Sequence, residues 1–302
     1  MKIAIAGGSG FIGRAITEEL RAHKHDICIL TRNPDNHKQA QGIRYIRWLQ
    51  EDAHPEKQLE GIDAFINLAG ESLNSGRWTQ KRKREIVESR IETAAEMTKI
   101  LSLLKKKPEC VINASAIGYY PVSESRTYTE KETKSGNGFL ARTVVLWEKE
   151  AKKAKTYCGR MVIARFGVIL GMDAGALPSI IMPYKVFAGG TLGSGRQWLS
   201  WIHIHDAARA IHYCLQNESI SGPINLTAPA PVRMKEFGQT AAEVLHRPHW
   251  LPVPSIALKT VMGEMSSMVL EGQCVMPDVL LSHSFTFDYP LLKGALEQLL
   301  DK

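Results

Sequence analysis

The sequence predicts an α/β fold, in which a doubly wound parallel sheet is followed by a smaller C-terminal region. Over the first 170 residues, short stretches that are apolar at nearly every position alternate with longer amphipathic stretches. Strands of that kind are buried on both faces, which requires helices on both sides of a parallel sheet. After Gly171 glycine and proline become frequent and divide the chain into short elements.

The apolar runs and the helical periods give the elements in order. We expect strands at 2–6, 26–31, 43–48, 62–68, 110–114 and 161–170, and helices at 11–23, 79–104 and 138–154. A further helix is expected to run to Leu215 with Asp206 as its cap, and a last sheet strand at 224–226. The main domain is therefore placed at 1–170, with 200–228 returning to it, and a smaller substrate or lid region at 171–302.

The composition is that of a globular chain. It has 302 residues, of which 44% are hydrophobic and 23% are charged. Its five cysteines lie far apart without a Cys-x-x-Cys pair, which disfavours a zinc site or a disulfide framework and suits a reducing compartment. The first residues already read as a strand, and no apolar stretch is long enough to span a bilayer. We therefore expect a cytoplasmic protein without a membrane partner.

A formal net charge of +7 raises the question of anionic partners. The densest basic cluster, 81–84, lies on a predicted helix whose apolar positions fall on another face, and no aromatic residues interleave with it. A solvated helix face is therefore favoured over a nucleic-acid surface. The expected partners are a small-molecule substrate and, at most, a second copy of the chain as a homodimer, with no nucleic acid.

A glycine-rich loop directly follows the first predicted strand. Its residues fit Gly8-x-Gly10-x-x-Gly13 and also the looser Gly7-x-x-Gly10-x-x-Gly13. Between a strand and a helix, such glycines permit a tight turn and let the backbone approach a pyrophosphate, which the helix N-terminus then binds. The sequence thus predicts a Rossmann-type dinucleotide site, with cofactor contacts from the loop residues Gly7, Gly10, Phe11, Ile12 and Gly13.

The end of the second strand indicates which dinucleotide binds. An acid about twenty residues past the glycines would hold the ribose 2′-hydroxyl of NAD. Here the stretch reads Thr31-Arg32-Asn33, and the first acid is Asp35. Because Arg32 is able to pair with a 2′-phosphate, with Thr31 beside it, we favour NADP over NAD; the alternative is a surface arginine.

Two further strands end in residues suited to a site. Leu68-Ala69-Gly70 follows the fourth strand, where small residues leave space for a cofactor. Ser115 follows the fifth strand and is expected near the nicotinamide, with Tyr119 and Tyr120 beyond it as candidate proton donors. The alternatives are a hydroxyl that caps local backbone and an aromatic plug.

The motifs quoted so far belong to a longer set, namely the glycine loop and the stretches 66–73, 76–79, 89–90, 115–120, 139–141, 147–148, 165–171, 193–198, 252–254 and 285–290. On these residues the chain resembles the extended branch of the short-chain dehydrogenase/reductase superfamily and, more narrowly, its epimerase-family members of the YfhF/YfcH type. The resemblance spans nearly the full length. It implies the same fold and a nicotinamide dinucleotide.

Working enzymes of that superfamily carry a serine after the fifth strand and a Tyr-x-x-x-Lys pair on the next helix. Ser115 matches the serine, but the helix from Gly138 has neither tyrosine nor lysine. Phe139 and Thr143 stand closest to the two positions, with a slip of one residue left open. The resemblance therefore carries over the fold, the cofactor site and Ser115, and leaves the reaction open.

The leading hypothesis is an NADP(H)-dependent oxidoreductase or epimerase that acts on a small polar substrate such as a nucleotide-linked sugar. Ser115 would polarise the substrate oxygen, Tyr119 and then Tyr120 are the candidate proton donors, and Arg165 is a candidate for contact with an anionic ligand or for a structural ion pair. The alternative is a non-catalytic NADP(H)-binding sensor or scaffold protein. His203-x-His205-Asp206 is interpreted as the end of a strand and a helix cap, and no metal is expected.

Overall fold

Seven parallel strands form the central sheet of the computed structural model, which describes residues 1–37 and 41–300. These strands are β1 (Lys2–Ala6), β2 (Asp26–Thr31), β3 (Ile43–Arg47), β4 (Ala64–Asn67), β5 (Cys110–Ala116), β7 (Arg160–Phe166) and β11 (Gly222–Leu226). Their order across the sheet is β11-β7-β5-β4-β1-β2-β3. The chain adds β2 and β3 on one side of β1 and then β4 on the other side, so the order of strands reverses between β1 and β4. The predicted doubly wound fold is therefore confirmed.

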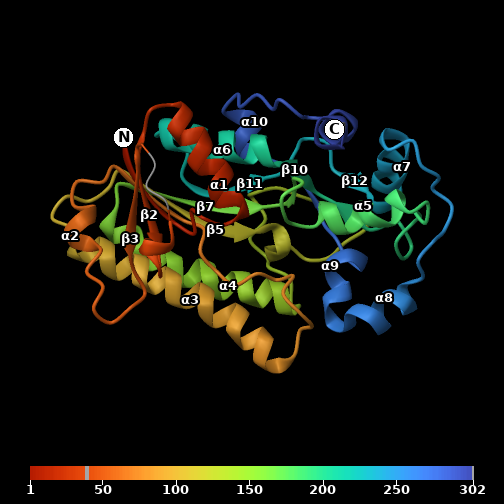
Figure 1. Ribbon diagram of the computed structural model, residues 1–302, viewed down its shortest axis with the longest axis horizontal. Coiled ribbons are helices and arrows are strands. Elements are labelled where there is room, and N and C mark those ends of the chain that lie inside the picture. The colour runs from red at the N-terminus through yellow and green to blue at the C-terminus, as the bar shows by residue number, and fades with distance from the viewer. Residues whose placement is uncertain (38–40, 301–302) are drawn as a thin grey trace.

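Helices cover both faces of this sheet, as continuously apolar strands require. Figure 1 shows α3 (Gln80–Leu103) and α4 (Phe139–Ala151) along one face, and α1 (Phe11–Ala22) and α6 (Ile204–Gln216) along the other. Ile16 and Leu20 of α1 are fully buried, one helical turn apart. The strands add side chains such as Ile5 and Phe65, which are also fully buried.

One predicted strand is wrong in its extent. The run 161–170 divides at Gly167 into β7 and a short β8 (Val168–Leu170), which leaves the main sheet and pairs with β10 (Trp201–His203). A Cβ at Gly167 would lie 2.6 Å from the carbonyl oxygen of Ser200. This close approach of a distant segment divides the strand, and the apolar pattern of the sequence runs through it unchanged.

The C-terminal region has a core of its own beside the sheet. Buried side chains such as Trp201, Phe237 and Leu296 pack there, contributed by β10 and by the helices α7 and α11. Its elements are α5 (Leu177–Lys185), β9 (Trp198–Leu199), β12 (Val232–Arg233), α7 (Met234–Val244), α8 (Ser255–Met262), α9 (Ser267–Leu270), β13 (Cys274–Val275), α10 (Asp278–Ser282) and α11 (Leu292–Leu300). Figure 1 places α5, α7, α8 and α9 together at one end of the molecule.

Two strands link this region to the rest of the chain. β11 pairs with β7 at the edge of the main sheet, and β13 pairs with β6 (Thr127–Tyr128), which lies between β5 and α4 in the sequence. In the part of the chain that the structure describes, two short helical segments precede β4, a 3-10 turn at Pro34–Asn36 and α2 (Glu56–Leu59). Within that same part, no helix is both long and apolar enough to cross a membrane.

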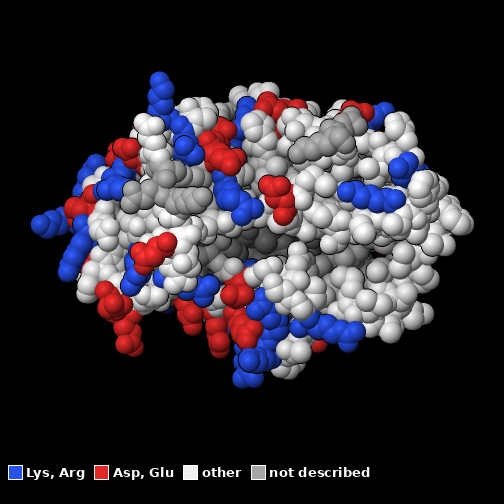
Figure 2. Space-filling view, in the orientation of Figure 1, with Lys and Arg blue, Asp and Glu red and all other residues white. Residues whose placement is uncertain are grey.

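Charge is distributed unevenly over the surface. On the face drawn in Figure 2, lysine, arginine and acidic side chains gather over the sheet half of the molecule, while the end formed by α5, α7 and α8 is mostly uncharged. The basic cluster 81–84 is largely paired: Lys81 and Arg82 contact Glu85, and Lys83 lies 2.8 Å from Glu264. The same view shows a hollow near the centre of the face, between the two helix layers.

Candidate functional site

The predicted site residues meet at the carboxyl edge of the sheet. In the strand register, Ala6 lies opposite Asn67 and Asn67 opposite Asn113, so the segments that follow β1, β4 and β5 emerge side by side. The buried amide of Asn67 donates to Asn113 Oδ1 at 2.8 Å and fixes the two strand ends together. This edge, at the reversal of strand order, is where ligands bind in open α/β sheets.

The glycine loop fits a dinucleotide phosphate group. Gly7 has φ +79°, and a Cβ there would lie 3.0 Å from Ala69 N, while a Cβ at Gly13 would lie 2.1 Å from Gly7 O. Both glycines are therefore required by packing within the chain. A Cβ at Gly10 would meet only Gly7 O, at 3.3 Å, so its other side is open. Gly10 caps α1 without a side-chain hydrogen bond, which leaves the first N–H groups of the helix available to an anion.

Phe11 lies at the start of α1 and also holds a second segment in place. A Cβ at Gly171 would lie 2.7 Å from Phe11 Cζ, and one at Gly175 would lie 3.2 Å from Phe11 Cε1. The segment 171–175 therefore packs directly on the phenyl ring. Ile12, next to it, packs against the main core. The side chains of Phe11 and Ile12 therefore serve packing.

The end of β2 presents Arg32 to solvent. Its backbone oxygen accepts a hydrogen bond from Gln50 Nε2 at 3.0 Å, and the side chain is exposed. Thr31 Oγ1 accepts from Asn33 N at 3.3 Å. Asp35, the first acid beyond the strand, is paired with Arg47 at 3.1 Å. The end of β2 therefore offers a cation and no free carboxylate.

Ser115 belongs to a buried polar network. Its hydroxyl donates to Glu148 Oε1 at 2.7 Å, and Arg165 binds the same carboxylate through Nε at 2.8 Å and Nη2 at 3.0 Å. All three residues are at most 3% exposed. Burial alone would lower the pKa of Arg165, but its hydrogen bonds and ion pair with Glu148 raise it above the usual range. The structure thus places Arg165 in a structural ion pair, the second of its two predicted roles.

The two tyrosines after β5 lie in different environments. Tyr120 is 1% exposed; its hydroxyl donates to Asn225 Oδ1 at 2.8 Å and accepts from Arg165 Nη1 at 3.0 Å. Burial raises the pKa of Tyr120 despite the nearby arginine. Tyr119 is half-buried, its hydroxyl donates to Thr133 O at 2.7 Å, and the Arg165 guanidinium stacks 3.6 Å from its ring centre. Of the two phenols, only that of Tyr119 lies within reach of a ligand.

The face of α4 that contacts Ser115 does not include Phe139, the residue that the sequence placed closest to the missing tyrosine. A Cβ at Gly118 would lie 3.5 Å from Leu140 Cβ, Val144 is buried, and Glu148 contacts Ser115. These residues are spaced by four and share one face of α4. Phe139 instead packs on Trp78, with its ring centre 5.1 Å away. Leu140 and Val144 therefore share the face of α4 that carries Glu148, one residue beyond Phe139 and Thr143.

Sequence reasoning missed Glu148, which connects Ser115 to Arg165. The sequence carries a weak signal for it, because Glu148 continues the apolar face of Leu140 and Val144. An acid on an apolar helix face is expected to have a buried partner. The partner itself is set by the packing of α4 on β5 and β7.

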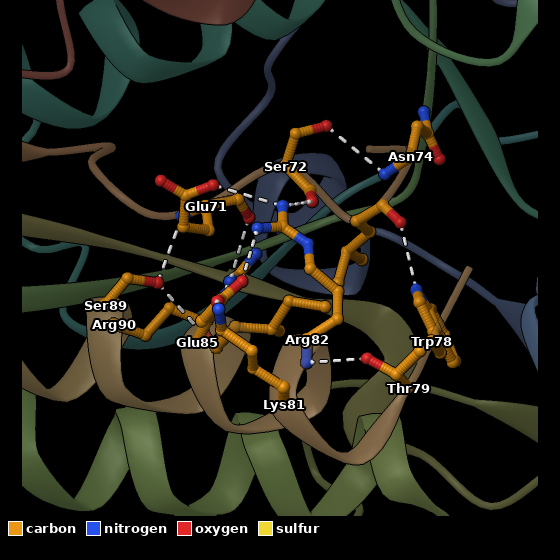
Figure 3. A network of polar contacts seen from close by, with 12 residues as sticks. Glu71, Ser72, Asn74, Trp78, Thr79, Lys81, Arg82, Glu85, Ser89 and Arg90 are labelled. Atoms are coloured by element: carbon orange, nitrogen blue, oxygen red, sulfur yellow. Dashed lines mark hydrogen bonds and ion pairs between the residues drawn. The ribbon is translucent and has the colours of Figure 1, made fainter. Parts of the chain in front are cut away.

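A second polar network fixes the loop that follows β4 (Figure 3). Arg82 donates to Ser72 O at 2.7 Å and Glu71 Oε2 at 3.1 Å, and Arg90 donates to Glu71 O at 3.1 Å. Arg90 also lies against Gly70, where a Cβ would be 3.2 Å from Arg90 Cγ. These contacts hold Leu68, Ala69 and Gly70 beside the glycine loop.

The segment after β10 has a structural role. α6 begins at Ile204 with His203 as its cap, so the expected cap at Asp206 was wrong. The Asp206 carboxylate instead accepts the backbone N–H groups of 288 and 289, both at 2.9 Å. His203 Nε2 contacts Gln298, and His205 contacts Asp288.

Two family models match the chain. One, described as the NAD dependent epimerase/dehydratase family, matches residues 3–226, and the other, a domain of unknown function (DUF1731), matches residues 253–299. The epimerase family protein YfhF of Bacillus subtilis is 48% identical over 300 residues, which cover 99% of this chain and 98% of that protein. The epimerase family protein SH2119 of Staphylococcus haemolyticus is 43% identical over 98% of each chain.

Solved structures are similar over the same length. The human epimerase family protein SDR39U1 (isoform 2), solved with NADPH, has a TM-score of 0.88 and 30% sequence identity, with 100% of each chain covered. A nucleoside-diphosphate sugar epimerase from Corynebacterium glutamicum has a TM-score of 0.77 and 28% identity, covering 99% of this chain and 58% of that one. The predicted family resemblance is therefore confirmed.

Proposed function

This chain belongs to the NAD dependent epimerase/dehydratase family, and we propose that it is an NADP(H)-dependent oxidoreductase or epimerase for a small polar substrate, such as a nucleotide-linked sugar. The observation that carries the proposal is the glycine loop at the reversal of strand order, where Gly10 is open on the side away from the protein. NADPH in the human relative supports the cofactor, and the name of the Corynebacterium relative supports the substrate class.

In this proposal the carboxyl edge of the sheet holds the dinucleotide. Gly7, Gly10 and Gly13 let the backbone approach the pyrophosphate, and the free N–H groups at the start of α1 bind it. Arg32 and Thr31 bind the ribose 2′-phosphate, and the segment 68–70 borders the other half of the cofactor. When bound, the nicotinamide supplies hydride transfer.

Proton transfer is assigned to the residues after β5. Tyr119 is the proposed acid or base, because its phenol is the more accessible of the two, and the Arg165 guanidinium holds the ring by stacking 3.6 Å from its centre. In this proposal Ser115 polarises the substrate oxygen, which requires its hydroxyl, 2% exposed and bonded to Glu148 in the structure, to become accessible when the substrate binds.

A non-catalytic NADP(H)-binding sensor or scaffold protein is the second candidate. The observation in its favour is the face of α4 that reaches Ser115 through Glu148, because the other residues on it, Leu140 and Val144, are unable to transfer a proton. A measurement of turnover distinguishes the two candidate functions. An enzyme oxidises NADPH, or exchanges its hydride, with some member of a panel of carbonyl compounds and sugar nucleotides; a sensor binds NADPH and turns over none.

The choice of cofactor is tested at Arg32. We expect the parent protein to bind NADPH more tightly than NADH, and Arg32→Ala to erase most of that preference. A charge-assisted contact is worth roughly 1.5–3 kcal/mol, which is about ten- to a hundred-fold in affinity. Arg21→Ala, which removes an exposed arginine from the last turn of α1, serves as the control and should leave both affinities unchanged. Equal affinities in the parent protein would contradict the assignment.

A further inference from the structure

Histidines from α6 and from the segment between α1 and β2 gather beside the last turn of α1. Glu19 and His23 lie one turn apart at the end of α1, and His212 of α6 faces them; one ligand atom from each lies within 4.8 Å of the others. Glu19 Oε1 is 3.5 Å from His23 Nδ1 and 3.6 Å from His212 Nδ1. The group borders an open cavity of about 290 Å³.

A fourth residue holds the buried histidine in place. His25, at the start of β2, contacts His212 Nε2 through its own Nε2 at 3.1 Å. With its Nε2 occupied in this way, His212 directs Nδ1 to the Glu19 side. A ligating imidazole is oriented in the same manner by a partner on its other nitrogen.

We propose that Glu19, His23 and His212 bind a divalent transition-metal ion of the zinc class, which ties the end of α1 to α6. Two imidazoles and one carboxylate are a donor set that Zn²⁺ accepts, with water in the fourth position. Tetrahedral Zn–N bonds of about 2.0–2.1 Å bring ligand atoms to roughly 3.4 Å, close to two of the separations already present. His23 Nδ1 lies 2.9 Å from the backbone oxygen of Glu19, and half of the ring is exposed, so metal binding requires His23 to leave this hydrogen bond and turn toward the ion.

The surrounding charges favour a cation. Arg209, the arginine that lines the same cavity, is neutralised by Asp206 at 3.2 Å and Asp288 at 3.0 Å.

Zinc titration of the full-length chain, untagged and stripped with a chelator, tests the site. We expect calorimetry at pH 7.5 to give one Zn²⁺ per chain, Co²⁺ to give visible absorption bands of tetrahedral coordination, and Zn²⁺ to raise the melting temperature. His23→Gln and Glu19→Gln should each weaken Zn²⁺ at least tenfold. His54→Gln is the matched control, because His54 also lies beside a glutamate, Glu56 at 3.4 Å, and belongs to no group of three ligands among the described residues.

Two results would overturn the site: a parent protein that binds no Zn²⁺, or binding that neither His23→Gln nor Glu19→Gln weakens. His23 is exposed, so its substitution leaves the fold intact and the test stays decisive. The site lies at the opposite end of α1 from Gly10, about 18 Å along a twelve-residue helix. NADPH affinity should therefore be the same in His23→Gln and parent, and failure of one proposal leaves the other standing.

Discussion

Tyr120 and Tyr119 are neighbours in the chain, yet their hydroxyl groups have different partners. The Tyr120 hydroxyl joins Asn225 to Arg165 inside the protein. Tyr120→Phe leaves both partners unsatisfied, so we expect the free energy of unfolding to fall by about 1–3 kcal/mol. Chemical denaturation followed by circular dichroism measures this change. An unchanged midpoint would mean that water or another donor replaces the hydroxyl.

Tyr119→Phe should lower turnover and leave the stability nearly unchanged, in contrast to Tyr120→Phe. The Tyr119 hydroxyl bonds to Thr133 O near solvent, so stability should change by less than about 1 kcal/mol. If Tyr119 transfers a proton, turnover should fall by at least about a hundred-fold while NADPH affinity stays the same. Once a substrate is known, a hydride-transfer assay with a parallel NADPH titration measures both quantities. Normal turnover would assign Tyr119 to packing.

Glu148 is the acid on which the buried network depends. Glu148→Gln leaves the Arg165 guanidinium buried without a counter-charge, and we expect a loss of about 3–5 kcal/mol in stability. Glu150→Gln is the control on the same helix, where the pair with Lys153 faces solvent and should contribute about 1 kcal/mol or less. Equal losses in the two variants would show that solvent reaches the Glu148 carboxylate.

The position of Ser115 was predictable because a residue just beyond a parallel strand must lie at the carboxyl edge. Its partner was not, since Glu148 lies 33 positions away on a helix whose rotation depends on packing. The same rotation decides that Leu140, and not Phe139, stands over Gly118. The local sequence pattern predicts which residues share a face of a helix. It does not predict, to within one residue, which of these faces points inward.

At the scale of elements, the central strands of the sheet were predictable because buried parallel strands are apolar at nearly every position, whereas the edge strand β3 alternates apolar residues with Arg44 and Arg47. β1 and β2 have the predicted bounds, and α1 ends one residue before its predicted end. The division at Gly167 was not predictable, because the oxygen that approaches it belongs to Ser200. Contacts between segments distant in sequence leave no periodic signal.

The contact between α1 and α6 should make stability depend on pH. Burial lowers the folded-state pKa of His212 and of His25, whereas the unfolded chain takes up these protons at an ordinary pKa near 6.5. The stability is thus fully present above about pH 6.5 and is lost as the pH falls below it, by up to about 1.4 kcal/mol per pH unit for each histidine. Unfolding in metal-free buffer at pH 7.5 and 5.5 should show the loss.

His212→Gln is the variant that assigns this pH dependence. Glutamine does not titrate in that range, so the difference in stability between the two pH values should shrink. His203, which burial also shifts to a lower pKa, retains its own contribution at the N-terminal cap of α6. An unchanged difference in His212→Gln would place the pH dependence at His203 or elsewhere.

At the scale of the molecule, the sheet half and the C-terminal region differ in how far the sequence predicted them. The order of strands and helices in the first part follows from periodicity. The later elements are two to thirteen residues long and punctuated by proline, so periodicity gives few of them. β13, for example, has two residues, and its partner β6 is also too short to show alternation.

The C-terminal region is nevertheless part of the structure that supports the candidate site. Gln273 donates to Tyr120 O at 3.1 Å, and the carbonyl oxygen of Met276 accepts from Asn225 Nδ2 at 2.9 Å. Val275 is fully buried against Tyr120 and Tyr128. Residues beyond 252 therefore satisfy polar groups and cover apolar rings that belong to the sheet half.

A chain that ends at residue 252 should consequently fail to fold as a stable monomer. It loses the partners of Asn225 and Tyr120, and it exposes the apolar side chains of α7 that pack against α11. Such buried polar and apolar groups cost more than a domain of ordinary stability is able to lose. We expect aggregation, or a melting transition that is broad and well below that of the full chain, in size-exclusion chromatography and calorimetry. A monomeric 1–252 chain that melts cooperatively and binds NADPH like the parent would show that the region is an independent appendage, and that the sheet half alone builds the cofactor site.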